Sequence, residues 1–185
     1  MNIILMGYRC TGKTTAGRRL AERMGLPFYD TDALVERREQ RTIPRIVAEQ
    51  GWQAFREAES EIIHELSGTD HSVIALGGGA VLDARNVENL KRNGFFVWLF
   101  AAPETIAARM EKDAVRGAER PALTGKTGIG ETNAVMAQRE PLYRRLAGLA
   151  VDTTRIETDR VVEVIRNALE GQISTVEATI GGKEK

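Results

Sequence analysis

A lysine and a threonine close a glycine-rich stretch near the start of the chain, GYRCTGKT. Four residues separate Gly7 from Gly12-Lys13-Thr14, which is the spacing of the Walker A motif, G-x-x-x-x-G-K-[ST]. Glycines let the backbone turn so that successive N–H groups surround a phosphate, and the next helix adds its positive end. The lysine can reach the β and γ phosphates, and the threonine hydroxyl suits Mg²⁺. The motif therefore predicts a nucleotide-phosphate site.

Two acids, Asp30 and Asp32, stand at the end of a short apolar stretch, LPFYDTD, that is typical of a second strand. Residues i and i+2 of a strand share a face, and at the carboxyl end of a parallel strand they face the ligand crevice. One carboxylate could support Mg²⁺ while the other accepts the proton of an attacking hydroxyl. Asp32 could instead be the N-cap of the helix expected near Ala33, and both interpretations stay open.

Three consecutive glycines, Gly77, Gly78 and Gly79, follow another expected strand in SVIALGGG. They remove every side chain from the end of that strand, so a small substrate could rest on bare backbone. A tight turn is the alternative, but a turn needs only one or two glycines.

Three arginines complete the candidate site: Arg56 after Phe55, Arg120 in a loop rich in glycine, and Arg139 on a late helix. An arginine can hold a carboxylate through two parallel hydrogen bonds. An exposed surface charge is the alternative for any one of them.

Alternating strands and helices must position these residues. The apolar runs predict strands at residues 2–6, 26–32, 72–79, 95–101 and 149–153. Helical spacing predicts helices at residues 13–25, 33–40, 43–67, 83–94, 103–113, 131–148 and 159–171. Thr42 and Asp83 are candidate N-caps. Strands that alternate with helices predict an α/β fold with parallel strands and helices on both faces of the sheet.

Composition narrows the class of protein. The 26 Lys and Arg residues balance 26 Asp and Glu residues, so no net positive field favours nucleic acid or an anionic membrane. The single cysteine permits no intrachain disulfide, and no apolar run approaches the roughly 18 residues of a membrane span. A first strand at residue 2 leaves no room for a signal peptide. We expect a cytoplasmic monomer that acts on small molecules.

Other polar and aromatic residues carry no predicted chemistry. Cys10 lies within the glycine loop, where only its N–H is needed, so Cys10→Ser should keep most of the activity. His64 and His71 are too isolated to form a metal site or to act as a base. Trp52 and Phe55, three residues apart, are expected to pack against a helix.

Taken together, six stretches resemble the shikimate kinase family over about residues 1–170, in the family's order. They are GYRCTGKTT, FYDTD, GWQAFREAE, VIALGGGAV, ERPALTGK and MAQREPLYRRLA. The Walker loop is common to many kinases, whereas the combination of D-x-D, F-R-x-x-E, G-G-G, R-P-x-L and R-x-P-x-Y is specific. The resemblance implies transfer of the γ-phosphate of ATP to the 3-hydroxyl of shikimate.

The resemblance also implies a domain organisation. It implies a three-layer P-loop kinase fold with a five-stranded parallel sheet, helices on both faces and a mobile lid. Residues 1–171 would form the single kinase domain, with substrate-binding helices at about 33–66 and the lid at about 114–130. Residues 172–185 are expected to be a polar, flexible tail.

Site roles follow from the resemblance, residue by residue. Lys13, Asp32 and Arg120 would be catalytic, with Asp32 as the base and Arg120 closing over the phosphates. ATP would be bound by Gly7, Cys10, Thr11, Gly12, Lys13, Thr14, Thr15, Arg109, Arg120 and Arg155. Shikimate would be bound by Asp32, Arg56, Gly77, Gly78, Gly79 and Arg139. Glu59 would orient Arg56, and Mg²⁺ would be held by Thr14 and, through water, by Asp30.

Three alternatives remain. A gluconate kinase would share the loop and the acidic pair, but the triple glycine and the pair Arg56 and Arg139 argue against it. An adenylate-type kinase must also hold a base and a phosphate in its acceptor site. A non-enzymatic ATP-binding module could lose Asp32 or Arg120 without losing binding, and both are present.

Overall fold

The computed structural model describes residues 1–115 and 128–180 of the chain, and within them five parallel strands form one sheet of order β2-β3-β1-β4-β5. The strands are β1 (Asn2–Met6), β2 (Phe28–Asp30), β3 (Val73–Ala75), β4 (Gly94–Phe100) and β5 (Leu149–Asp152). The helices are α1 (Lys13–Met24), α2 (Thr31–Glu39), α3 (Ile43–Ser67), α4 (Ala84–Lys91), α5 (Pro103–Val115), α6 (Gly128–Leu146) and α7 (Thr158–Ile180), with a short 3₁₀ helix, η1 (Ala80–Leu82). The predicted α/β class and the five-stranded parallel sheet are confirmed.

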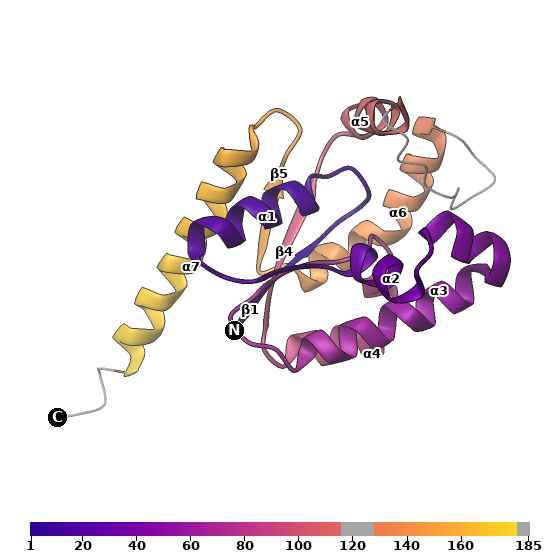
Figure 1. Ribbon diagram of the computed structural model, residues 1–185. Helices are drawn as coiled ribbons and strands as arrows, with labels where there is room; N and C mark the ends of the chain where they lie inside the picture. The colour runs from indigo at the N-terminus through magenta and orange to yellow at the C-terminus, as the bar shows by residue number, and fades with distance from the viewer. Residues whose placement is uncertain (116–127, 181–185) are drawn as a thin grey trace.

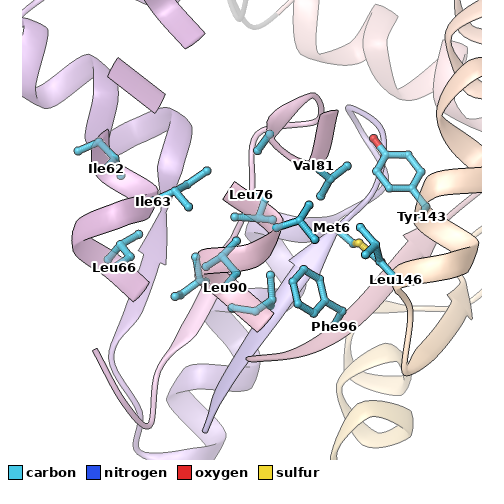
Figure 2. Close-up of a cluster of buried hydrophobic side chains, with 14 of the residues drawn as sticks. Met6, Ile62, Ile63, Leu66, Leu76, Val81, Leu90, Phe96, Tyr143 and Leu146 are labelled. Atoms are coloured by element: carbon cyan, nitrogen blue, oxygen red, sulfur yellow. The ribbon is translucent and has the colours of Figure 1, made fainter. Parts of the chain in front are cut away.

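The central strands β1 and β3 and most of β4 are buried on both faces, which explains their continuous apolar runs. Side chains alternate along β1, so Ile3 and Leu5 pack with α1 and α7 on one face. Ile4 and Met6 pack with α3, α4 and α6 on the other face. Figure 1 shows these two helical layers, and Figure 2 shows part of the second core around Met6.

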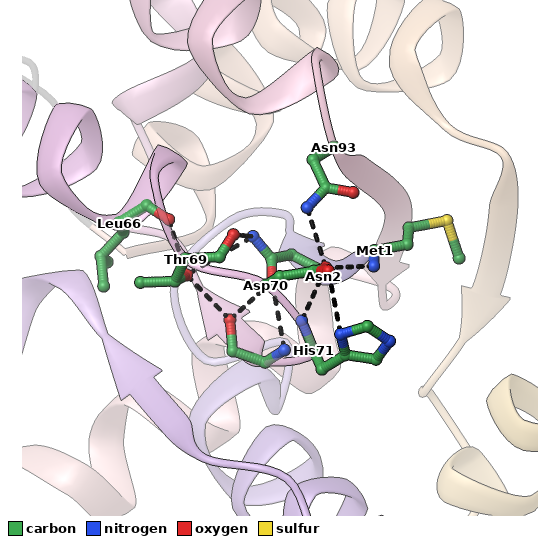
Figure 3. Close-up of polar contacts among 8 residues, drawn as sticks. Met1, Asn2, Leu66, Thr69, Asp70, His71 and Asn93 are labelled. Atoms are coloured by element: carbon green, nitrogen blue, oxygen red, sulfur yellow. Dashed lines mark hydrogen bonds and ion pairs between the residues drawn. The ribbon is translucent and has the colours of Figure 1, made fainter.

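All the strands run in one direction, so their carboxyl ends share one edge of the sheet. The loop Gly7–Gly12 follows β1, α2 follows β2, and the glycines follow β3. At the opposite edge, the buried Asn2 accepts hydrogen bonds from Ser72, and Asp70 accepts one from Asn93 at 2.9 Å (Figure 3). The amino ends of β1, β3 and β4 are therefore tied together away from the candidate site.

The end of β2 differs from the expectation. The predicted strand reached Asp32, but β2 ends at Asp30, and Asp32 lies in the first turn of α2. Asp30 is the N-cap, because its Oδ1 accepts a hydrogen bond from the Ala33 N–H at 3.2 Å. The assignment of the two acids to one strand face was wrong, and so was the alternative in which Asp32 is the cap.

The start of α3 is also capped differently. Thr42 occupies the N-cap position but makes no side-chain capping hydrogen bond. The Ile43 N–H instead donates to Glu36 Oε1 at 2.9 Å, so the carboxylate of α2 satisfies this helix end. The sequence predicted that this helix continues from residue 43 to residue 67, but Gly51, with φ 84° and ψ 169°, breaks it into two helical segments.

Two boundaries near the carboxyl half of the chain change as well. The helix α7 does not stop at Gly171 but continues to Ile180, so the predicted tail is partly helical. The predicted lid, at about 114–130, begins within α5 and ends within α6. Its remaining residues, including Arg120, lie outside the described residues.

Candidate active site

The loop after β1 is folded around the ammonium group of Lys13. Lys13 Nζ donates to the carbonyl oxygens of Gly7 at 2.9 Å and Tyr8 at 2.7 Å. A side chain at Gly7 would overlap the carbonyl oxygen of Leu99, and its φ of 144° also favours glycine. Gly12, at φ 91°, precedes α1 without a side-chain cap. This helix end can therefore offer its N–H groups to an anion.

A pocket opens above this loop, and it contains most of the residues predicted to bind ATP. They are Cys10, Thr11, Gly12, Lys13, Thr14, Thr15, Arg109 and Arg155. Asp30 and Asp32 line the same pocket. Gly7 does not line the pocket but accepts a hydrogen bond from Lys13, and Arg120 lies outside the described residues.

Arg109 joins three elements at one wall of this pocket. Its Nη1 donates to the Cys10 carbonyl at 3.1 Å, and its Nη2 donates to the Thr153 carbonyl at 2.6 Å. The Thr153 hydroxyl in turn donates to the Thr11 carbonyl at 3.1 Å. Arg109 and Thr153 therefore tie α5 and the end of β5 to the phosphate loop. Cys10 Sγ lies 3.5 Å from Asp113 Oδ2, also on this wall.

Thr14 and Asp30 form the oxygen pair that could support a divalent cation. The Thr14 hydroxyl donates to Asp30 Oδ2 at 2.7 Å, and both residues line the pocket. Among the described residues, no group of three or more His, Cys, Asp or Glu side chains could enclose a metal ion. One hydroxyl and one carboxylate fit Mg²⁺, which keeps several waters and binds through phosphates.

Two of the three glycines, Gly77 and Gly79, make room for side chains of the candidate site. A Cβ at Gly77 would overlap Glu59 Oε1 and Asp32 Oδ1, and a Cβ at Gly79 would overlap the Arg56 guanidinium. The Thr31 hydroxyl also accepts a hydrogen bond from the Gly77 N–H at 2.8 Å. The structure thus brings Asp32 of α2 together with Glu59 and Arg56 of α3 against the glycine backbone that follows β3.

Glu59 lies at the base of this cluster with no exposed surface. Arg56 Nη1 donates to Glu59 Oε2, whereas Oε1 has no hydrogen-bond partner among the described residues. Burial raises the pKa of Glu59 to about 7; the Arg56 guanidinium acts in the opposite direction and the Asp32 carboxylate in the same one. The Arg56 guanidinium also lies 4.9 Å from the Phe55 ring centroid and 5.6 Å from that of Trp52.

Arg139 reaches the same backbone from α6. Its Nη1 donates to the Gly78 carbonyl at 2.9 Å. The side chain is 6% exposed, and Nε is buried with no hydrogen-bond partner in the described part of the chain. An unpaired buried donor is costly, so this atom marks a place for an acceptor group.

Two residues with no predicted role belong to the site. Thr153 holds Arg109 and the phosphate loop, and only its place at the end of a predicted strand could have suggested it. Tyr143, from the R-x-P-x-Y stretch, donates its hydroxyl proton to the Gly78 carbonyl. The two histidines lie on the surface.

Sequence and structure comparisons identify the family of this chain. A family model described as shikimate kinase matches residues 9–170. The shikimate kinase of Syntrophus aciditrophicus is 44% identical over 179 residues, and the match covers 92% of each chain. The shikimate kinase of Symbiobacterium thermophilum is 42% identical over 170 residues, and the match covers 92% of this chain and 97% of the relative. A solved structure of shikimate kinase from Acinetobacter baumannii in complex with shikimate superposes with a TM-score of 0.85 at 33% identity, covering 92% of this chain and 93% of the other. The chain belongs to the shikimate kinase family.

Proposed function

We propose that this chain transfers the γ-phosphate of ATP to the 3-hydroxyl of shikimate, giving shikimate 3-phosphate and ADP in the biosynthesis of aromatic amino acids. The position of Asp32 is the observation that carries this proposal. Asp32 lines the nucleotide pocket and also lies against Gly77 beside Glu59. One carboxylate therefore borders both the donor pocket and the cluster that would hold the acceptor.

The donor side would work by positioning and charge. Lys13 is already held at the phosphate loop, and we propose that its ammonium group turns from the loop carbonyls to the phosphate oxygens. Arg109 keeps the loop and the nucleotide wall in place through its hydrogen bonds to Cys10 and Thr153. Arg155 would lie near the adenine, and Arg120 would contact the phosphates. Phosphoryl transfer depends mostly on such positioning and neutralisation.

Thr14 and Asp30 would hold Mg²⁺, Thr14 directly and Asp30 through water. When bound, the ion would neutralise charge on the phosphates. The hydrogen bond between the two side chains keeps their oxygens together in its absence.

The acceptor side would recognise a carboxylate with two arginines. Arg56 lies against Gly79, and Arg139 donates to the carbonyl of Gly78. The unpaired Arg139 Nε supports the assignment, because a carboxylate oxygen would satisfy it. Glu59 would keep the Arg56 guanidinium in place through their ion pair.

Asp32 would accept the proton of the attacking hydroxyl. A carboxylate at the border between both pockets can reach a hydroxyl that faces the γ-phosphate. We further propose that the protein acts as a cytoplasmic monomer. No helix in the described residues has the length and apolar character to span a membrane.

ADP release by the purified protein tests the proposal. ATP and Mg²⁺ are supplied with shikimate, with gluconate or with no acceptor, and the product is identified by ³¹P and ¹H NMR. We expect shikimate-dependent release and a phosphate ester at the 3-hydroxyl. ADP release with gluconate but not with shikimate would show that the acceptor is a different one. ATP binding without ADP release in any of the three mixtures would favour a non-enzymatic binding module.

A further inference from the structure

The carbonyl oxygen of Gly78 receives two hydrogen bonds from one helix. Arg139 Nη1 and the Tyr143 hydroxyl, four residues apart on α6, both donate to it. Residues at this spacing lie on the same face of a helix. The second donor is absent from the roles that the family resemblance implies.

The environment of Tyr143 keeps it a donor. The side chain is 1% exposed, and its ring stacks on Trp98 with centroids 6.1 Å apart and an interplanar angle of 25°. Figure 2 shows the ring in the core while the hydroxyl points toward the end of the sheet that carries the glycines. Burial raises the pKa of the phenol, so it keeps its proton at neutral pH.

These two hydrogen bonds fix the orientation of a peptide that would otherwise rotate easily. Glycines have no side chain to restrict φ and ψ, so the unit between Gly78 and Gly79 has little local preference. No peptide bond in the described residues is cis. In a trans peptide the C=O and the next N–H point in opposite directions, so the Gly79 N–H points away from α6.

The orientation matters for an anionic acceptor. A carbonyl oxygen turned toward a carboxylate repels it, whereas the N–H end of the peptide attracts it. The same carbonyl also holds Arg139 Nη1, while Nε of that guanidinium is buried and has no hydrogen-bond partner in the described part of the chain. The Gly78 carbonyl thus fixes both the orientation of the glycine backbone and the position of the Arg139 guanidinium.

We propose that Tyr143 is a positioning residue for the acceptor: its hydroxyl holds the Gly78 carbonyl against α6 and so orients the glycine backbone and Arg139 toward the substrate carboxylate. This inference rests on the proposed function. It separates the role of the hydroxyl from that of the ring, which packs in the core with Trp98 whatever the ligand.

Tyr143→Phe tests the inference, because it removes the hydroxyl and keeps the ring. The measurements are kcat, the KM values for shikimate and for ATP, the Kd for shikimate by calorimetry, and the urea midpoint of unfolding. Tyr29→Phe is the matched control: Tyr29 also packs on the same core, and within the described part of the chain its hydroxyl makes no hydrogen bond.

We expect Tyr143→Phe to raise the KM and Kd for shikimate about three- to tenfold, the range of one neutral hydrogen bond, and to change the KM for ATP less than about twofold. Tyr29→Phe should change neither KM. An unchanged shikimate KM, equal rises in both KM values, or the same effect in Tyr29→Phe would overturn the inference. Wild-type protein that releases no ADP with shikimate would overturn the proposed function and this inference with it, whereas an active wild type with an unaltered Tyr143→Phe would overturn the inference alone.

Discussion

Asp32 and Glu59 each place one carboxylate oxygen where the side chain of residue 77 would otherwise be. The two acids come from different helices, α2 and α3, and meet because Gly77 leaves this space empty. Glu59 forms an ion pair with Arg56 on the proposed acceptor side, and Asp32 lines the nucleotide pocket. The first of the three glycines therefore joins the two halves of the site.

Gly77→Ala should damage turnover through these carboxylates. Its methyl group would push Asp32 and Glu59 from their positions, and a displacement of about 1 Å in an active site can cost on the order of 100-fold in rate. We expect kcat to fall by about this factor. Steady-state kinetics with both substrates is the measurement.

Gly171→Ala is the control for that substitution, since a Cβ at Gly171 in α7 would meet no atom within 4 Å. It should keep wild-type kcat and leave stability unchanged or slightly higher. Equal kcat values for Gly77→Ala and Gly171→Ala would show that the space at residue 77 has no role in catalysis.

Glu59 should make the stability of the ligand-free protein depend on pH. Its pKa is raised from 4.5 to about 7, so the folded state binds more protons than the unfolded state between these values. The stabilisation is complete below about pH 4.5 and is lost as pH rises through 7, on the order of 3 kcal/mol in all. Burial is the main cause of this raised pKa and the Asp32 carboxylate adds to it, while Arg56 and Arg139 oppose it.

Urea unfolding of wild type and Glu59→Gln at pH 5 and pH 8 measures this effect, because other acids cancel in the difference. Glutamine cannot ionise, so the wild type should lose stability relative to Glu59→Gln as pH rises. A difference that stays constant between pH 5 and pH 8 would mean that Glu59 is ionised throughout.

Arg139→Ala should weaken shikimate binding far more than ATP binding. The substitution removes a charged donor to the proposed carboxylate and one hydrogen bond to Gly78. A loss of about 10- to 100-fold in shikimate affinity is expected for a hydrogen bond to a charged group. Calorimetric titration with each ligand separates the two affinities.

Arg144→Ala controls for the loss of an arginine from the same helix. Arg144 pairs with Glu140 and is largely exposed, so both affinities should remain near wild type. If Arg139→Ala weakened ATP and shikimate binding equally, the residue would be supporting the fold rather than the acceptor site.

The sequence predicted the layers of this fold because its signals are local. The Walker spacing, the apolar strands and the Asp83 cap depend on neighbours in the chain, and the structure has all three. The predicted end of the second strand, at Asp32, was wrong because the choice between strand and helix depends on one capping hydrogen bond, from the Ala33 N–H to Asp30. Propensity alone does not decide such a competition.

The parts of the site that the sequence left out depend on distant contacts. Tyr143 meets Gly78 across 65 positions of sequence, and Thr153 meets Thr11 across 142. The use of Gly77 and Gly79 was predicted only in part: bare backbone for a substrate was expected, whereas the structure fills that space with side chains of the site itself. No local pattern encodes which side chain will occupy such a space.

The turnover of Asp32→Asn tests most directly whether one carboxylate serves both pockets. The affinities for ATP and shikimate are measured on the same preparation. Asparagine keeps the shape of the side chain and removes its charge and basicity. We predict an ATP Kd within about twofold of wild type and a kcat lower by about 10²- to 10⁴-fold, the usual contribution of a general base. Near-normal turnover in this variant would contradict the account, because the proton of the shikimate hydroxyl would then leave without Asp32.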